Sequence, residues 1–413
     1  MRAMRRDPRE AIGSTRGATS DRATGRAHGL LLASEIAFAV VLLIGGGLLL
    51  RSFAALADVD PGFHQAGLVT ADVLVPPDRY PTRAHVLDFF TRVEDRLGRL
   101  PGVRSVSAID RLPYGPSISR LGFRIQGRDI ADAETPLAYN ASARPGYFRT
   151  MGIPLVAGRE FTAADHADAP RSVVVGRSIA ERWWPDRSPL GERIQVFGVD
   201  WEIVGVVGDI HHLGPSTPAD AMLYLPQAQD VATRRMMTIV VRTDGSPEAL
   251  LAQVRGEIRA LDAQLPVEHL RTFGALESER TAGQRFNALL IGTFAMIAVV
   301  LAAVGIYGVL SFVVAQRTRE IGVRMALGAS RGAVMAMFVR LAMRAVIVGG
   351  LVGLGIALPL SGFARGMLFG IEPTDRFTYA AVPVLVGLIA LAAAWVPAMR
   401  AARVSPSTAM VAD

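Results

Sequence analysis

The chain alternates between long uncharged runs and polar stretches, and the uncharged runs predict membrane-spanning helices. Gly29–Leu50 is a run of 22 residues whose only charged residue is Glu35. As a helix this run is about 33 Å long, which matches the roughly 30 Å hydrocarbon core of a bilayer. Three later runs carry no charged residue over 20 residues or more: Phe286–Ala315, Ala345–Ala364 and Phe377–Met399. We therefore predict four transmembrane helices, arranged as one before and three after a long polar stretch.

The arginines beside these runs predict the orientation of the helices. Seven arginines precede the first run, against three acidic residues, and four more follow the second run: Arg317, Arg319, Arg324 and Arg331. Positive charge next to a span stays on the cytoplasmic side, whereas a long domain is translocated regardless of its charge. Both termini are therefore expected in the cytoplasm, and residues 51–285 outside it. The first run is too long for a cleavable signal peptide, and no small-residue cleavage site follows it.

Residues 51–285 alternate between strand and helix patterns, which predicts an α+β domain. Strand patterns cover residues 68–75, 103–109, 172–175, 193–197 and 201–207, the last two as a hairpin across Gly198-Val199-Asp200. Amphipathic helices are expected at 83–100, at 247–261 and in a segment that ends near Trp184. We expect two lobes, with the break between Arg128 and Pro136. The predicted fold class is a membrane protein of four transmembrane α-helices (1+3), with this large α+β domain inserted between the first and second.

Composition excludes several classes of function. All 44 basic residues are arginine, and lysine is absent. The phosphate-binding loop of ATPases needs a lysine at the β- and γ-phosphates, so any ATP hydrolysis must come from a partner. Cysteine is also absent, which excludes disulfides and thiolate metal sites. The net charge of +7 is dispersed along the chain, so no nucleic-acid partner is expected.

The polar stretch contains two weak candidates for metal binding and no catalytic motif. Asp209, His211 and His212 are close in sequence, but adjacent side chains of an extended segment point to opposite faces. The segment Asp165–Asp168 carries two aspartates and a histidine, and this pattern is more often a solvated loop than a cation site. No nucleophile-and-base motif of a hydrolase is present. We therefore predict no catalytic residue, no metal ligand and no cofactor.

Three residues within the spans are candidates for packing or for an ion pair. Glu35 lies near the cytoplasmic edge of the first span, where its side chain can reach the interface or pair with an arginine. This depth favours a structural role over a proton relay, and it disfavours an ion-coupled carrier, which needs more ionisable groups in its spans. Gly349 and Gly353 are one helical turn apart and would let two helix backbones approach closely. For each glycine the alternative is that it is merely tolerated in a membrane helix.

The loop after the second span predicts a short helix at the membrane surface. Gln316–Ser330 reads QRTREIGVRMALGAS, with apolar residues on one side, charged residues on the other, and Gly328 as its end. Such a helix can dock into a groove of a soluble partner. A simple interfacial turn is the alternative.

This loop is one of several segments that resemble a known protein family. Together these segments cover nearly the whole chain. AQRTREIGVRMALGASRGAV (Ala315–Val334) and PAMRAARVSPSTAM (Pro397–Met410) resemble the macrolide-exporter (MacB) and FtsX-like ABC permeases. RPGYFRTMGIPLVAGREF (Arg144–Phe161) and EIVGVVGDIHH (Glu202–His212) resemble the periplasmic core domain of the same family. The motifs are long and stand in the family's order, so the resemblance is specific.

The sequence departs from the family pattern in one place and begins in an unusual way. Relatives usually carry asparagine and glutamate at the positions of Gly176 and Arg177, which puts the local hydrogen bonding in doubt. The start, MRAMRRDPREAIGSTRG, resembles the linker before the second half of long permeases, in which the whole unit of helix, outer domain and three helices occurs twice. Two interpretations fit this start: the chain is the C-terminal half of such a permease, or it is a truncated gene model.

The resemblance implies a machine rather than an enzyme. Its partners would be an ABC ATP-binding subunit in the cytoplasm and a second permease unit, as a homodimer or a fused half. The family's coupling helix implies ATPase contacts for six residues: Arg317, Arg319, Glu320, Ile321, Arg324 and Met325. ATP-driven movement of the outer domain, or mechanotransmission, would export a substrate from the periplasm. The family's location is the bacterial inner membrane, and a periplasmic adaptor or outer-membrane channel would be a further partner.

The implied domains follow the hydrophobic pattern. They are a cytoplasmic segment (1–28), a first span (29–50), a MacB-like periplasmic core domain (51–285) and an FtsX-like three-helix domain (286–413). A membrane-embedded sensor or regulatory scaffold, which controls a periplasmic partner without moving a solute, is the alternative function. A receptor is expected to continue into a cytoplasmic output domain, whereas here two more spans follow the second, which favours the permease. A membrane-anchored hydrolase is disfavoured because it would require a catalytic constellation.

Overall fold

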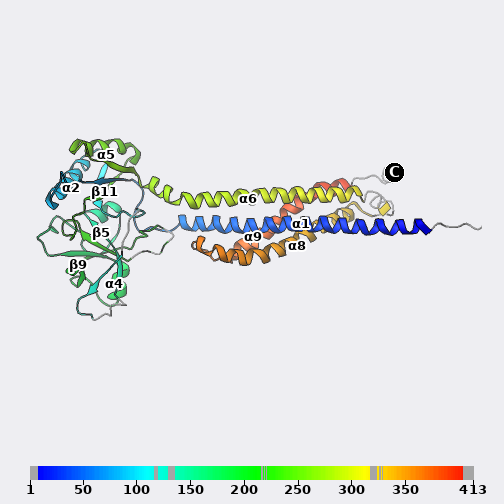
Figure 1. Ribbon diagram of the computed structural model, residues 1–413, viewed down its shortest axis with the longest axis horizontal. Helices are drawn as coiled ribbons and strands as arrows, with labels where there is room; N and C mark the ends of the chain where they lie inside the picture. Colours follow the sequence, from blue (N-terminus) through cyan, green and yellow to red (C-terminus); the bar gives the residue numbers. More distant parts are fainter. Residues whose placement is uncertain are drawn as a thin grey trace, which may run out of the picture. The chain divides into compact units, whose positions relative to one another are not determined.

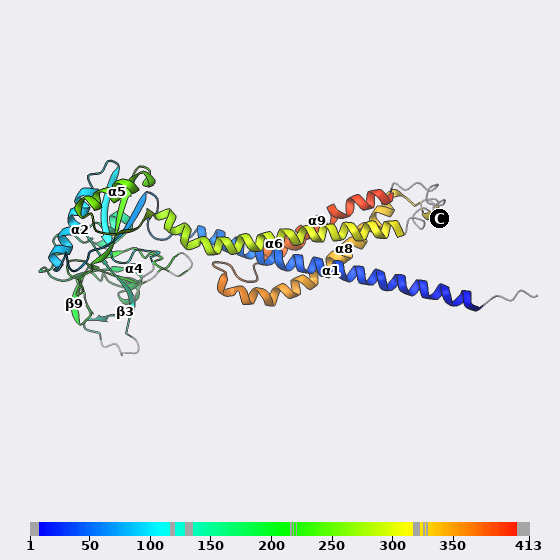
Figure 2. The same cartoon turned by 45° about the horizontal axis from the view of Figure 1, so that its top comes forward.

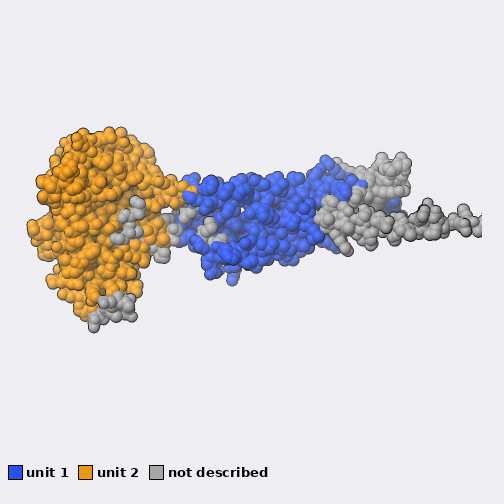
Figure 3. Space-filling model, viewed as in Figure 1, with its two compact units in different colours: residues 1–57, 283–413 blue, residues 58–282 orange. Residues whose placement is uncertain are grey.

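The chain forms two compact units, each with its own hydrophobic core. The computed structural model describes residues 8–115, 120–128, 135–214, 217, 219, 221–316, 323–324, 327 and 329–402. Residues 1–57 and 283–413 form one unit, here called the membrane unit, and residues 58–282 form the other, here called the sheet unit (Figure 3).

The membrane unit is built from helices long and apolar enough to cross a bilayer (Figure 1). Within the described residues there are four: α1 (Pro8–Ala57), α6 (Phe273–Gln316), α8 (Arg331–Phe363) and α9 (Arg376–Ala402). A short 3₁₀ helix, η2 (Ala364–Met367), follows α8. The predicted arrangement of one helix before and three after the polar domain is confirmed. Three prolines, Pro359, Pro383 and Pro397, lie inside α8 and α9, where neighbouring helices make them tolerable in a membrane.

The core of the membrane unit is a set of residue stripes repeated every four positions. Such residues share one face of a helix, because four residues make slightly more than one turn. The stripe on α1 is Leu32, Ile36, Val40, Ile44 and Leu48, and the stripe on α9 is Val382, Val386, Ala390, Ala394 and Ala398. The other helix faces expose large apolar side chains such as Phe294 and Phe377, which suits a lipid environment and would be unfavourable in water.

The sheet unit contains one mixed sheet with helices packed on it. The described strands, in chain order, are β1 (Leu68–Leu74), β2 (Val103–Ile109), β3 (Arg120–Gly122), β4 (Arg124–Ile125), β5 (Leu137–Ala143), β6 (Leu155–Gly158), β7 (Ser172–Gly176), β8 (Arg193–Val196), β9 (Val199–Val207), β10 (Met222–Pro226), β11 (Met236–Thr243) and β12 (Val267–Thr272). The described helices are α2 (Arg83–Leu97), α3 (Tyr147–Met151), α4 (Arg177–Trp183) and α5 (Pro247–Leu261), in addition to the start of α6. The α+β domain predicted from the pattern is therefore present.

The sheet has two halves, and its strand order runs β12-β1-β11-β2-β5-β10-β7-β9-β8-β4, with β3 on β5 and β6 on β9. In the first half, α2 and α5 cover one face of β1, β11 and β2 (Figure 2). The halves join at β2 and β5, where Ile109 pairs with Ala143. The first and last strands of the unit are neighbours, since Val69 of β1 pairs with Thr272 of β12.

The position that we predicted for the break between lobes is wrong. The interval between Arg128 and Pro136 lies inside the second half, between β4 and β5, and residues 129–134 are outside the described range. The chain instead enters the second half between Ile109 and Arg120 and leaves it between Pro226 and Met236. A polar loop within one half has the same kind of composition as a linker between the halves. Composition therefore could not tell the two kinds of connection apart.

The predicted hairpin between β8 and β9 is present, but its turn is shorter than we expected. Val196 pairs with Val199, so the turn consists of Phe197 and Gly198, with φ of 54° and 74°. Two successive positive φ angles give the turn that matches the natural twist of paired strands. Asp200 therefore belongs to β9, and a phenylalanine occupies a left-handed position that usually favours glycine or asparagine.

An aromatic cluster connects the two halves of the sheet unit to the beginning of α6. Phe148 of α3 meets Tyr224 of β10 edge to face, with ring centroids 4.9 Å apart. Phe273, the first residue of α6, is fully buried and meets Phe63 at 5.3 Å. Such pairs stabilise by about 0.5–1.5 kcal/mol beyond their buried area. The first turn of α6 is therefore part of the sheet unit's core.

Candidate functional site

Most of the expected ATPase-contact residues lie outside the described range. This applies to Arg317, Arg319, Glu320, Ile321 and Met325. Arg324 is described, and its Nη1 lies 3.3 Å from the Sδ of Met337 on α8. Arg324 therefore lies close to the first turns of α8.

Gly349 and Gly353 lie where α8 touches α1. A Cβ added to Gly349 would lie 2.5 Å from the carbonyl oxygen of Ala33, and one added to Gly353 would lie 2.8 Å from that of Ala37. Real Cβ atoms essentially never approach other atoms so closely. Only glycine therefore permits this separation of the two backbones, which is the geometry of small-residue packing in membrane helices.

Glu35 faces α6 from α1, next to Gly305. A Cβ on Gly305 would overlap the Oε2 atom of Glu35, so the missing side chain provides the space for the carboxyl group. Oε2 is buried and has no hydrogen-bond partner among the described residues. The surrounding cavity of about 350 Å³ is apolar and is lined by Phe38, Leu42, Phe294, Ile297, Ala298 and Leu301. Within the described residues Glu35 has no arginine partner, so the ion pair that we considered is absent there.

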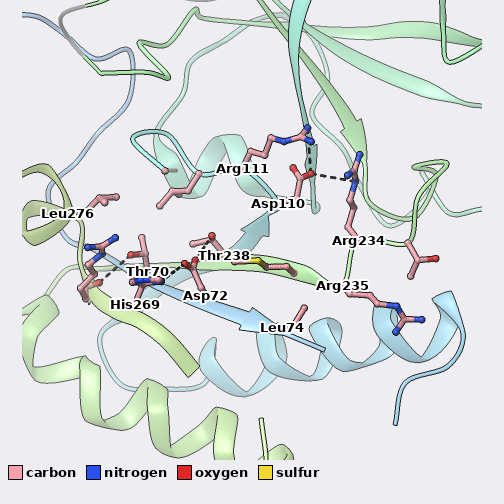
Figure 4. Close-up of a pocket in the computed structure, with 15 residues that line it drawn as sticks. Thr70, Asp72, Leu74, Asp110, Arg111, Arg234, Arg235, Thr238, His269 and Leu276 are labelled. Carbon is pink, nitrogen blue, oxygen red and sulfur yellow. Dashed lines mark hydrogen bonds and ion pairs between the residues drawn. The ribbon is translucent and has the colours of Figure 1, made fainter. Parts of the chain in front are cut away.

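A polar cavity of about 390 Å³ lies on the sheet unit, on the face of β1 and β11 opposite α2 and α5 (Figure 4). At one end, Asp72 accepts a hydrogen bond from Oγ1 of Thr238 at 2.6 Å. Its second oxygen lies 3.1 Å from Nδ1 of His269. At the other end, Arg111 and Arg234 flank Asp110, as Figure 4 shows.

The acid at the second end of this cavity is held by several partners. Asp110 lies 3.4 Å from Nε of Arg234 and accepts a hydrogen bond from the backbone N–H of Ser142 at 2.7 Å. Burial raises the pKa of Asp110, against the opposing effect of these partners. Our sequence reasoning missed the cavity. The sequence feature that could have revealed the cavity is the alternation in β1. Val69, Ala71 and Val73 face the core on one side of the sheet, and the intervening residues face the cavity on the other.

The histidines after β9 do not form a metal site with Asp209. Asp209 instead accepts hydrogen bonds from the backbone N–H and the hydroxyl of Ser178, both at 2.9 Å, and so caps the start of α4. His212 is buried, and burial together with the charge of Arg111 lowers its pKa to about 4. Nδ1 of His211 lies 2.6 Å from the carbonyl oxygen of Thr217.

At Gly176, where the sequence departs from the family pattern, the local hydrogen bonding is provided by Asp209. Gly176 precedes α4 and offers no side chain to cap it. A Cβ at this position would lie 2.6 Å from Oδ1 of Asp209, so the carboxylate occupies the space that a side chain would need. One of the first N–H groups of the helix, that of Ser178, is thus satisfied by a residue after β9 rather than by the residue before the helix.

Asp165 is a structural centre of its loop. Its oxygens accept hydrogen bonds from Arg159 at 2.7 and 2.9 Å, from the N–H of Thr162 at 2.8 Å and from the hydroxyl of Ser172 at 2.7 Å. Burial raises the pKa of Asp165, but these hydrogen bonds outweigh burial and lower the pKa to about 2. Its oxygens are therefore already used within the fold.

We predict that Asp165→Asn destabilises the sheet unit in a pH-dependent way. A carboxyl whose pKa falls on folding stabilises above its unfolded pKa of about 3.9, and this contribution is lost as the pH drops toward 2. The free energy of unfolding at pH 7 should fall by about 2 kcal/mol, measured by urea unfolding of the full chain in detergent. Asp168→Asn, at an exposed position three residues on, is the control and should change little. Equal losses at pH 7 and pH 2 would contradict the assignment.

We also predict that Gly349→Ala and Gly353→Ala loosen the contact between α1 and α8. Overpacking costs about 1–3 kcal/mol, since the new methyl group meets the backbone of α1 rather than a flexible side chain. Unfolding of the full chain by SDS titration in mixed micelles measures this. Gly355→Ala is the matched control, because nothing lies within 4 Å of its added Cβ. If all three variants behave alike, the close approach is not important for stability.

Comparison with known proteins places both units in one family. A family model described as the MacB-like periplasmic core domain matches residues 36–261, and one described as the FtsX-like permease C-terminal matches residues 292–406. The pyoverdine export ATP-binding/permease protein PvdT of Pseudomonas fluorescens is 25% identical over 77% of this chain and 47% of its own length. The macrolide export ATP-binding/permease protein MacB of Agrobacterium fabrum is 28% identical over 67% of this chain and 44% of its own. The chain thus spans about half the length of the curated relatives it matches.

Solved structures also match, at low identity. The periplasmic region of MacB from Actinobacillus actinomycetemcomitans is 15% identical, covers 53% of this chain and 94% of that one, and gives a TM-score of 0.37. The extracellular domain of the ABC-type transporter YknZ from Gram-positive bacteria is 16% identical, covers 49% and 100%, and gives 0.32. Both TM-scores lie below 0.5, so the assignment depends on the family models. Since the first model alone covers more than half of the 413 residues, the chain belongs to the MacB/FtsX-like family of ABC-transporter permeases.

Proposed function

We propose that the chain is the permease subunit of an ABC-type exporter and that it converts ATP hydrolysis by a partner into movement of a periplasmic domain. Membership of the family and the two relatives named for export support export as the activity. The 413 residues contain no lysine and hence no phosphate-binding loop, so the proposed ATPase lies outside these residues. The exported compound is taken from the periplasm.

The continuity of α6 is the observation that carries this proposal. The helix runs unbroken over 44 residues and contains no proline. Near its start, Phe273 and Leu276 are buried in the sheet unit's core. Further along, Ile306 and Leu310 are buried in the core of the membrane unit. A stiff helix with residues in both cores transmits a displacement, whereas the described residues of the spans offer no polar lining for a solute path.

The partners follow from the same proposal. The loop containing Arg317, Arg319, Glu320, Ile321, Arg324 and Met325 contacts the ATPase from the cytoplasm. A second permease unit completes the pair, as a second copy or as a fused half, and a periplasmic adaptor or outer-membrane channel carries the substrate onward. Both termini lie on the cytoplasmic side of the bacterial inner membrane.

A second candidate function is a membrane-embedded sensor or regulatory scaffold. The polar cavity on the sheet unit favours it, because a cavity of about 390 Å³ is large enough for a small ligand. In that case ligand binding would control a periplasmic partner, and no ATPase would associate with the loop after α6.

We predict that exchanging charges in the loop, by Arg324→Glu together with Glu320→Arg, breaks the association with the ATPase. Like charges placed against each other at an interface cost several kcal/mol, so binding should weaken by at least about tenfold. Co-purification and ATP turnover in detergent measure this. The control pair, Arg365→Glu with Glu372→Arg, makes the same exchange at exposed positions elsewhere in the membrane unit and should bind normally. If wild type binds no ATPase, the permease proposal fails in favour of the scaffold.

We further predict that Ala282→Pro uncouples the sheet unit from the ATPase. Proline inside a helix removes a backbone hydrogen bond and costs about 3 kcal/mol, which produces a kink. Because the chain has no cysteine, Arg99→Cys provides a single site for a spin label on the sheet unit. ATP should shift the label-to-label distance between two permease units in the Ala282→Ser control and not in Ala282→Pro, while ATP turnover stays within about twofold. A full shift in the proline variant would exclude α6 as the path.

A further inference from the structure

A cavity of about 420 Å³ lies between the end of α6 and the beginning of α8. It is here called the arginine cavity. Its walls combine apolar side chains with two guanidinium groups: Val313 of α6 and Met337, Phe338, Leu341, Arg340 and Arg344 of α8. Phe338 is buried at its base, whereas both arginines are exposed at its opening.

The two arginines lie at the edge of the hydrocarbon core. The uncharged part of α8 begins immediately after Arg344, and the 19 residues from there to Phe363 are about 28 Å long as a helix, close to the thickness of the core. Arg340 is one turn, about 6 Å, further out. Because long basic side chains extend toward the interface, both guanidinium groups lie at the level of the lipid headgroups.

Neither arginine has a partner within the described residues. No hydrogen bond or ion pair joins Arg340 or Arg344 to another residue of that part of the chain. Nη1 of Arg324 lies 3.3 Å from Sδ of Met337, which lines the same cavity. Two guanidinium groups, those of Arg340 and Arg344, therefore lie at this opening between two membrane helices with no acidic partner among the described residues.

We propose that the arginine cavity binds an anionic phospholipid. The phosphate group is held by Arg340 and Arg344, whose planar donors match phosphate oxygens, and one acyl chain lies along Val313 and Leu341. Basic pockets between transmembrane helices bind anionic headgroups in this way. The lipid supplies the negative charge that the described chain lacks here, and it stabilises α6 against α8 next to the loop after α6.

The test compares lipid binding to the full chain in detergent by native mass spectrometry, with phosphatidylglycerol and phosphatidylcholine as probes. Arg340→Gln with Arg344→Gln should weaken phosphatidylglycerol binding by about thirtyfold, at roughly fivefold per arginine. The control, Arg99→Gln with Arg255→Gln, removes the same charge at exposed positions on the sheet unit and should bind normally. Ala336→Phe, which fills the cavity without changing charge, should also abolish binding.

Each other outcome overturns the proposal. Phosphatidylglycerol binding that survives in both the arginine and the phenylalanine variants means that the cavity is not the site. Equal losses in the control variant indicate non-specific charge attraction, and equal binding of the two lipids removes the role of the negative headgroup. Displacement of the lipid by inorganic phosphate alone indicates a simple anion site. If the arginine variant binds lipid normally but loses the ATPase, the cavity faces an acidic protein surface instead.

Discussion

Inside a bilayer, apolar side chains gain no hydrophobic free energy by moving from lipid into a helix interface. A bundle of membrane helices is therefore stabilised by how closely its backbones can approach. In this chain that approach is between α1 and α8, where Gly349 and Gly353 leave room for the backbone of α1. Van der Waals contacts fall off steeply with separation, so a small displacement there would weaken the whole interface. α1 also meets α6, where Glu35 occupies the space beside Gly305, and α9, where a Cβ on Gly47 would lie 3.0 Å from the side chain of Thr378.

The sheet unit is stabilised differently from the membrane unit, because its surroundings are aqueous and its polar groups lose water when they are buried. Two of its buried charged groups are held by several partners: the carboxylate of Asp165 accepts hydrogen bonds from Arg159, Thr162 and Ser172, and Arg144 bonds both oxygens of Glu94 at 2.6 and 2.8 Å and the side-chain oxygen of Gln227 at 2.8 Å. A buried charge without a partner would cost several kcal/mol, so these pairs constrain which loops can meet. The two units thus achieve a defined structure by unlike means, through contact distance in one and through paired polar groups in the other.

The parts of the fold that were predictable from sequence are those set by local pattern. Span positions follow from uncharged runs, and β2 and α5 begin where predicted because Gly102 precedes the strand and Pro247 begins the helix. Features that depend on distant residues were not predictable. The parallel pairing of β5 with β10 joins residues about 80 positions apart, and the cap of α4 comes from Asp209, 32 positions after Arg177. The turn at Phe197 was missed because its left-handed geometry is carried by a residue that rarely adopts it.

Val69 and Thr272 pair with each other at the two ends of the sheet unit, so the chain enters and leaves this unit at neighbouring points. A domain with adjacent ends can be placed in a loop without changing the spacing of the flanking helices. During synthesis, β1 must wait for β11 and β12, some 170 to 200 residues later, before its pairing is complete. In evolutionary terms, the same adjacency makes the sheet unit an exchangeable module, which can be replaced or modified while the helices keep their own contacts.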